Sequence, residues 1–253
     1  MFRPRIIPML LLKDAGLVKT VQFKNPRYIG DPINAIRIFN DKEVDELVLL
    51  DIDASTSNRG PDLNVLKSVA SECFMPLSFG GGIGSIELIR EILKIGVEKV
   101  ILNSAAVKNP NLVSEASQNF GKSTIIVSID YRANLFGSNV YINGGSTKTK
   151  HKPVDWAIEC ERLGAGEIII NSINNEGLMS GYDFDLLRSV SNAVSIPVIA
   201  SGGAGELKHF SKAILDCNAS AVAAGSFFVF KGKHKAVLIT YPTRKEINLI
   251  LKE

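Results

Sequence analysis

Two similar stretches, Pro76–Gly84 and Pro197–Gly205, constrain the fold and function of this chain more than any other feature. Each is a short apolar run, typical of a strand buried on both faces, that ends in a glycine turn just before a helical pattern begins. Glycine lets the backbone approach a ligand closely, and the first N–H groups of a helix lack internal partners. The copies lie about 120 residues apart, at equivalent places in the two halves. We therefore interpret the chain as a duplicated unit that holds a ligand with a phosphate at each end.

Short apolar runs alternate with amphipathic segments along the chain. Eight runs are typical of strands: Arg5–Leu11, Glu46–Asp51, Pro76–Phe79, Lys99–Asn103, Thr124–Asp130, Glu167–Asn171, Pro197–Ser201 and Ala221–Gly225. Segments that favour helices include Asn64–Cys73, Ile86–Ile95, Leu112–Phe120, Pro153–Leu163, Asp183–Val190, Leu207–Leu215 and Arg244–Leu251. This alternation predicts a parallel sheet, and eight units predict a closed (β/α)8 TIM barrel of two homologous half-barrels. No linker divides the 253 residues, so we expect one domain over 1–253.

Two long connections interrupt this regular pattern. The first, from Leu12 to Gly30, is polar and glycine-bearing, and it is long enough to act as a lid. The second, Tyr131–Lys150, contains an apolar-polar alternation followed by Gly144-Gly145, which predicts a small hairpin over the barrel mouth.

Composition argues against several classes of function. The 29 basic and 26 acidic residues leave a net charge of +3, too small to indicate a nucleic-acid partner. The apolar run Ile6–Leu12 is interrupted by Pro8 and is too short to cross a membrane. Cys73, Cys160 and Cys217 are scattered and odd in number. We expect reduced cysteines in a cytoplasmic protein, with no metal site and no cofactor.

Several predicted strands end in a polar residue, and active sites of such barrels lie at the carboxyl ends of the strands. Asp130 ends the fifth strand, where partial burial raises a carboxyl pKa towards working pH, so we predict that it is catalytic. A helix cap or an ion-pair partner is the alternative role. Asp51, Asn103 and Asn171 are expected to line the same mouth.

The glycine turns and nearby hydroxyls predict two phosphate sites. Gly80–Gly82 with Ser104 would hold one phosphate, and Gly202–Gly203 with Gly225 and Ser226 would hold the other.

Charged residues stand at the opposite ends of four strands: Arg5, Glu46, Lys99 and Glu167. A buried charge is costly unless it is paired. Two cations and two anions at the barrel bottom are therefore expected to form a self-neutralising ring, which would stabilise the lower face or act as a gate.

Over essentially its whole length the chain resembles HisF, the cyclase subunit of imidazole glycerol phosphate synthase, a barrel of the ribulose-phosphate-binding type. The matching stretches are Arg5–Pro8, Gly30–Pro32, Asp45–Asp51, Phe79–Ile83, Asn103–Val107, Gly164–Ile168, Gly181–Asp183 and Ile196–Gly205. The resemblance implies a HisH-type glutaminase partner on the barrel bottom and ammonia passing through the barrel to the mouth. It also implies two aspartates for acid/base work, two phosphate sites and a gate of four charged residues.

Many of the implied residues are present. Asp130 matches the second family aspartate, and Lys19 lies in the family's mobile first loop. The gate residues match Arg5, Glu46, Lys99 and Glu167. The phosphate-site residues match Gly81, Gly82, Asn103, Gly177, Ser201, Gly202, Gly203 and Ser226.

Two departures concern the acceptor chemistry. Leu11 stands where the resemblance places the first aspartate, and leucine cannot move a proton. The family's acidic, threonine-bearing loop after the sixth strand corresponds to Asn171–Met179, which lacks several of those hydroxyls and carboxylates. The ammonia path is thus retained, while the acceptor site differs.

This combination is similar to a branch of HisF-like proteins from surface-polysaccharide and flagellar-sugar gene clusters. The stretches that carry the likeness are Leu10–Lys13, Gly16–Thr20, Ile33–Phe39 and His234–Pro242. The likeness implies ammonia delivery, with a HisH-type glutaminase and an ATP-dependent amidotransferase, for converting an acetamido sugar to an acetamidino sugar. The alternatives are the histidine-pathway cyclase and a non-enzymatic barrel that activates a glutaminase. The related isomerase of that pathway is disfavoured, because it would require an aspartate on strand one.

Overall fold

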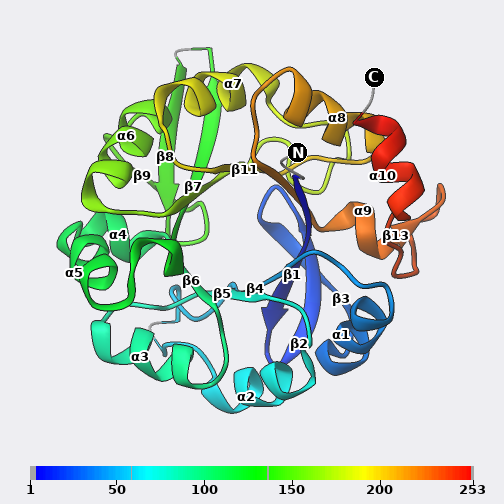
Figure 1. The fold of residues 1–253 in the computed structure, drawn as a ribbon, viewed down its shortest axis with the longest axis horizontal. Coiled ribbons are helices and arrows are strands. Elements are labelled where there is room, and N and C mark those ends of the chain that lie inside the picture. Colours follow the sequence, from blue (N-terminus) through cyan, green and yellow to red (C-terminus); the bar gives the residue numbers. More distant parts are fainter. Residues whose placement is uncertain (1–3, 58, 136, 252–253) are drawn as a thin grey trace.

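The computed structural model describes residues 4–57, 59–135 and 137–251, and eight parallel strands in it form a closed barrel (Figure 1). The strands are β1 Arg5–Lys13, β4 Leu47–Asp51, β5 Leu77–Gly80, β6 Lys99–Leu102, β7 Ile125–Asn134, β10 Glu167–Ser172, β11 Val198–Ser201 and β12 Ala221–Ala224. The barrel closes because β1 pairs with both β12 and β4, while β10 pairs with both β7 and β11. The predicted (β/α)8 fold is confirmed.

Helices surround the barrel (Figure 1). They are α1 Pro32–Asp41, α2 Leu63–Glu72, α3 Ile86–Lys94, α4 Ser104–Lys108, α5 Asn111–Phe120, α6 Pro153–Leu163, α7 Phe184–Ala193, α8 Leu207–Leu215, α9 Ser226–Val229 and α10 Arg244–Ile250. Local signals explain where they begin: the Asp31, Ser85 and Asp183 side chains accept backbone N–H bonds as N-caps of α1, α3 and α7. Among the described helices, none is long and apolar enough for a bilayer crossing.

The strands bury two separate apolar layers. Outward-facing residues pack against the helices in the larger core, with Phe39, Phe79, Trp156 and Phe210 among its bulky members. The inward-facing residues form a second cluster inside the barrel: Ile7, Met9, Val48, Ile101, Ile126, Ile169, Ile199, Ala221 and Ala223. The barrel interior is therefore apolar between its two ends.

Two antiparallel extensions rise from the carboxyl ends of the strands. The expected long connection from Leu12 to Gly30 is not irregular: β1 continues to Lys13, and β2 Gly16–Val21 and β3 Lys24–Gly30 fold back along it. Between 131 and 150, β7 runs on to Asn134 and pairs with β8 Gly137–Ile142, which pairs with β9 Thr147–Lys148. A further small hairpin, β13 Phe230–Lys231 with β14 Ala236–Val237, precedes α10.

Candidate functional site

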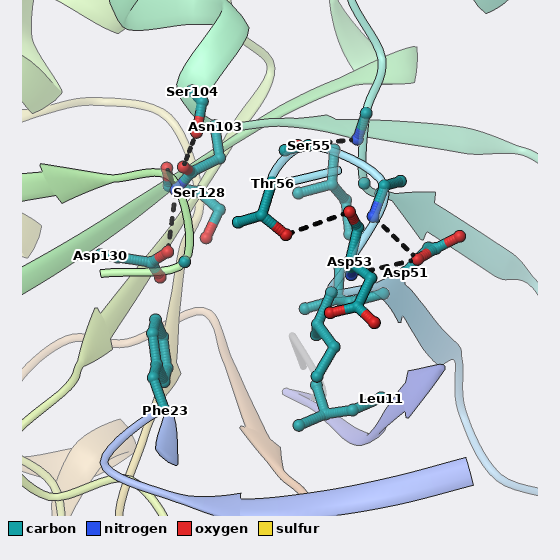
Figure 2. Close-up of a pocket in the computed structure, with 18 of the residues that line it drawn as sticks. Leu11, Phe23, Asp51, Asp53, Ser55, Thr56, Asn103, Ser104, Ser128 and Asp130 are labelled. Atoms are coloured by element: carbon teal, nitrogen blue, oxygen red, sulfur yellow. Dashed lines mark hydrogen bonds between the residues drawn. The ribbon is translucent and has the colours of Figure 1, made fainter. Parts of the chain in front are cut away.

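A cavity of about 540 Å³ opens at the carboxyl ends of the barrel strands, and we call it the mouth cavity. Its wall contains residues from all eight barrel strands or the turns that follow them, together with β2 and the loop after β10. The volume is typical of a site for a small organic ligand. Figure 2 shows Leu11, Asp53 and Asp130 in the wall of this cavity.

Asp130 lies at the centre of a hydrogen-bond network in the mouth cavity. The Asn171 Nδ2 donates to Asp130 Oδ1 at 2.9 Å, and the Asn103 Nδ2 donates to Asp130 Oδ2 at 3.0 Å. Asn103 Nδ2 also donates to the Ser128 carbonyl oxygen at 2.9 Å. The register of the parallel strands brings these side chains together, because Asn171 pairs directly with Asp130.

The mouth cavity changes the acidity of its carboxyl groups. Burial raises the pKa of Asp130 to about 6, although the hydrogen bonds from Asn171 and Asn103 oppose this shift and the charge of Glu176 adds to it. A carboxyl group with this pKa is available in both protonation states near neutral pH, as a general acid or base requires.

The first predicted phosphate site lies between β5 and α4, and we call Gly81, Gly82 and Ser104 the first cradle. Gly81 and Gly82 have φ angles of 117° and 67°, and a Cβ at position 81 would collide with the Asp51 carbonyl oxygen. Both glycines are therefore required by backbone geometry. The Gly82 N–H donates to Ser55 Oγ at 3.0 Å, so a bound phosphate would replace this hydroxyl.

The second predicted phosphate site follows β11 and β12, and we call Ser201–Gly203, Gly225 and Ser226 the second cradle. Ser201 and Gly225 line the mouth cavity. The Lys19 ammonium lies where a side chain at position 225 would stand, and its Nζ donates to the Met9 carbonyl oxygen at 3.3 Å. Burial lowers the pKa of Lys19. The charge of Glu176 opposes this shift, and an anion at this cradle would further favour the charged lysine.

At the opposite end of the barrel, Arg5, Glu46, Lys99 and Glu167 form a closed set of ion pairs that we call the charge ring. Arg5 contacts Glu46 through Nη1 and Glu167 through Nη2, the latter at 2.8 Å. Lys99 Nζ lies 2.9 Å from Glu167 Oε1 and 3.3 Å from Glu46 Oε2. Ser78 Oγ donates to Glu46 Oε1 at 2.7 Å, and the Glu46 side chain is only 2% exposed. Two cations and two anions thus neutralise one another below the apolar interior.

Comparison with known proteins agrees with this geometry. A family model described as "Histidine biosynthesis protein" matches residues 5–235. A protein of Pseudomonas aeruginosa, named provisionally as an imidazole glycerol phosphate synthase subunit of the HisF type, is 48% identical over 250 residues, which are 98% of this chain and all of that relative. The chain belongs to the HisF-like family of histidine biosynthesis proteins.

Other relatives give the same family. A provisionally named HisF subunit from Leptospira interrogans is 46% identical over 97% of this chain and 98% of its own length. The HisF subunit of imidazole glycerol phosphate synthase from Petrotoga mobilis is 43% identical over 90% of this chain and 91% of its own length.

In this HisF-like barrel, Leu11 lies in the wall of the mouth cavity, two residues before the end of β1 (Figure 2). Its side chain is 9% exposed, and it stands beside Leu50 of the neighbouring strand, with which it is paired in register. These two neighbouring side chains are apolar, and neither can exchange a proton.

Two other predicted positions, Asp51 and Gly177, have contacts that hold parts of the cavity wall. The Asp51 carboxylate accepts two hydrogen bonds from Arg59 Nη2, both at 2.9 Å, and further ones from the Asp53 and Ala54 N–H groups, so it holds the loop after β4. Gly177 packs under β2, where a Cβ would collide with the Thr20 carbonyl oxygen. These contacts position the cavity wall.

The structure also brings to the HisF-like mouth residues that the motifs did not indicate. Glu176 lines the cavity near Lys19, and burial raises its pKa. Lys13 and Asp53 form an ion pair of 3.0 Å in the wall. Strand alternation could have identified Lys13, because it follows Leu11 on the inward face of β1. Nothing local in the sequence indicates the Asp53 contact. Among the described residues, no cluster of three or more His, Cys, Asp or Glu could hold a metal ion.

Proposed function

We propose that this HisF-like chain is an ammonia-using synthase subunit. In this proposal a HisH-type glutaminase docks at the amino-terminal end of the barrel, and ammonia passes through the interior to a phosphorylated acceptor in the mouth cavity. The observation that supports the proposal is the arrangement along one barrel: the charge ring at one end, an apolar interior, and Asp130 at the other end. An apolar interior suits neutral ammonia, because a cation would lose its hydration there.

Imidazole ring closure is the first candidate for the acceptor chemistry, because the relatives are named as imidazole glycerol phosphate synthase subunits. Ammonia would join a phosphoribulosyl-formimino carboxamide ribotide, and the products would be imidazole glycerol phosphate and an aminoimidazole carboxamide ribotide. That substrate carries two phosphates, which matches the two cradles. Asp130, with its pKa near 6, would move the proton.

Sugar amidation is the second candidate, and Leu11 is the observation that favours it. A barrel without an acid on β1 still provides a route for ammonia to an ATP-dependent amidotransferase that forms an acetamidino sugar. In this alternative the amidotransferase performs the acceptor chemistry, and the barrel with its glutaminase supplies nitrogen for surface polysaccharide synthesis.

Turnover of the bisphosphate substrate with excess ammonium at mildly alkaline pH separates the two candidates. If Leu11 has removed ring closure, Leu11→Asp is expected to raise turnover by about 10²-fold or more, since general acid catalysis contributes at least that factor. Leu50→Asp is the matched control, because it places a carboxylate in the same wall on the neighbouring strand. Efficient turnover by the unmodified chain would instead support the cyclase and exclude a purely delivering role.

Inorganic phosphate is expected to stabilise the fold if both cradles bind phosphate. Each site would contribute about 2.7 kcal/mol at 100 times its dissociation constant, measured as a rise in melting temperature. Ser104→Asp places a negative charge in the first cradle and is expected to remove about half of this gain. Sulfate and chloride at equal ionic strength control for general salt effects. An equal rise for Ser104→Asp would contradict a phosphate site at the first cradle.

A further inference from the structure

The inward face of β1 has an ionisable residue directly above the apolar level of the mouth. Alternation along the strand places Arg5 in the charge ring, Ile7 and Met9 in the barrel interior, and Leu11 and Lys13 in the wall of the mouth cavity. Leu11 is therefore not the last inward residue of the strand. The next one, Lys13, is a cation at the outer level of the cavity.

Lys13 is paired across the sheet with a carboxylate from the loop after β4. Its Nζ lies 3.0 Å from Asp53 Oδ2, and the two side chains are 32% and 27% exposed. The hydrogen bond that Lys13 donates to Asp53 raises the pKa of Lys13, so Lys13 is a cation at neutral pH. Figure 2 shows the Asp53 carboxylate at the cavity, on the opposite side from Asp130.

The Asp53 backbone is held on both sides. Its N–H donates to Asp51 Oδ1 at 3.2 Å, and Arg59 clamps the same Asp51 carboxylate. Its carbonyl oxygen accepts hydrogen bonds from Thr56 Oγ1 at 3.1 Å and Ser57 Oγ at 2.6 Å. These hydrogen bonds order the backbone around Asp53 in the absence of a ligand. A ligand that binds the Asp53 carboxylate would therefore lose little free energy to ordering this loop.

The pair retains hydrogen-bonding capacity towards the cavity. Within the described ranges, Asp53 Oδ1 has no hydrogen-bond partner, and the Lys13 ammonium has donors beyond the one aimed at Asp53. An acceptor and a donor thus lie side by side above the apolar wall of Leu11 and Leu50. Adjacent hydroxyls on a carbon chain fit this pattern, because each hydroxyl both donates and accepts while the carbon chain contacts the leucines.

We infer that the Lys13–Asp53 pair is a specificity element that binds adjacent hydroxyls of the acceptor. The inference rests on the proposed function, in which a phosphorylated acceptor enters the mouth cavity. The cradles then bind the phosphate, and the pair distinguishes a phosphorylated polyhydroxy compound from a bare phosphate.

Calorimetric titration with two probes, ribose 5-phosphate and inorganic phosphate, tests the inference. The double variant Lys13→Met with Asp53→Leu removes both charges and leaves the net charge unchanged. It is expected to weaken ribose 5-phosphate binding by about tenfold or more, as for loss of a hydrogen bond to a charged group, with phosphate binding unchanged. Arg162→Met with Glu159→Leu, which removes an exposed ion pair on α6, is the matched control.

The possible results distinguish failure of this inference from failure of the proposed function on which it rests. If the double variant binds ribose 5-phosphate as tightly as the unmodified chain does, or if the unmodified chain never prefers the sugar phosphate, the inference is overturned while the phosphate cradles stand. If the unmodified chain binds neither probe, the phosphorylated acceptor itself is wrong, and the inference falls with it.

Discussion

Replacement of Asp130 by Asn is expected to lower ammonia-dependent turnover of the acceptor substrate by about 10²- to 10⁴-fold without destabilising the fold. The amide retains the shape of the carboxyl group but cannot move a proton. Two amide nitrogens now donate to Asp130, and one of them would face the new NH2 group. Asn171 can rotate its amide to relieve this conflict, because its Oδ1 is buried without a partner in the described structure.

The pH dependence of stability tests the raised pKa of Asp130 through Asp130→Asn. The folded-state pKa of about 6 lies above the ordinary value of 3.8, so the folded protein loses stability as the pH rises through this interval. The neutral amide lacks that loss, and its melting temperature relative to the unmodified chain is expected to increase between pH 4 and pH 7.

Kinetics supply the second half of this test. Turnover of the unmodified chain is expected to rise with pH to a plateau with its midpoint near pH 6 if ionised Asp130 is the base, with un-ionised ammonia held at constant concentration. Asp14→Asn, in the exposed turn after β1, is the control carboxylate. Unchanged turnover in Asp130→Asn would exclude Asp130 from the chemistry.

The fold was predictable because its main signals are local. The run Ile125–Asp130 is apolar enough to be a strand buried on both faces, and Asp183 or Ser85 marks a helix start within a few residues. The connection after β1 was harder to predict. Its residues 17–20 are buried against the barrel as a strand, although Lys19 and Thr20 are polar. Tertiary packing, which no local pattern records, overrode the polarity of the segment.

The sequence allows prediction of those site contacts that depend only on the register of the barrel strands. Asp130, Asn103 and Asn171 follow buried strands, so their meeting follows from the parallel barrel. The Lys13–Asp53 and Asp51–Arg59 contacts depend on how one loop folds after β4, and that loop has no periodic pattern. Lys19 against Gly225 depends on the path of the β2–β3 hairpin across the mouth. Such contacts between distant loops require the coordinates.

The charge ring is expected to be the most sensitive feature at the other end of the barrel. Lys99→Met would leave two glutamates opposite one arginine, with Glu46 almost fully buried. Breaking a buried ion pair in this way costs about 3–5 kcal/mol of unfolding free energy. Arg162→Met, which breaks an exposed pair on α6, should cost no more than about 1 kcal/mol.

A compensating change separates the charge effect from simple loss of packing. Adding Glu46→Gln to Lys99→Met restores a neutral set of one cation and one anion, so the double variant is expected to be more stable than Lys99→Met alone. Denaturant unfolding of the two single variants and the double variant measures this coupling. Additive losses would mean that Lys99 and Glu46 do not interact energetically, despite their 3.3 Å separation.

The same variants test whether the charge ring controls ammonia passage. Under the proposed function, ammonia released by a glutaminase at the amino-terminal end would have to pass the ring, whereas free ammonium salts would reach the mouth cavity directly from solvent. Lys99→Met is therefore expected to reduce glutamine-dependent turnover more than ammonium-dependent turnover, measured below its melting temperature with the complex intact. Equal losses with the two nitrogen sources would show that the ring stabilises the barrel's lower face and does not gate ammonia. Because a stability role lowers both rates together, the ratio of the two rates decides between a gate and a structural ring.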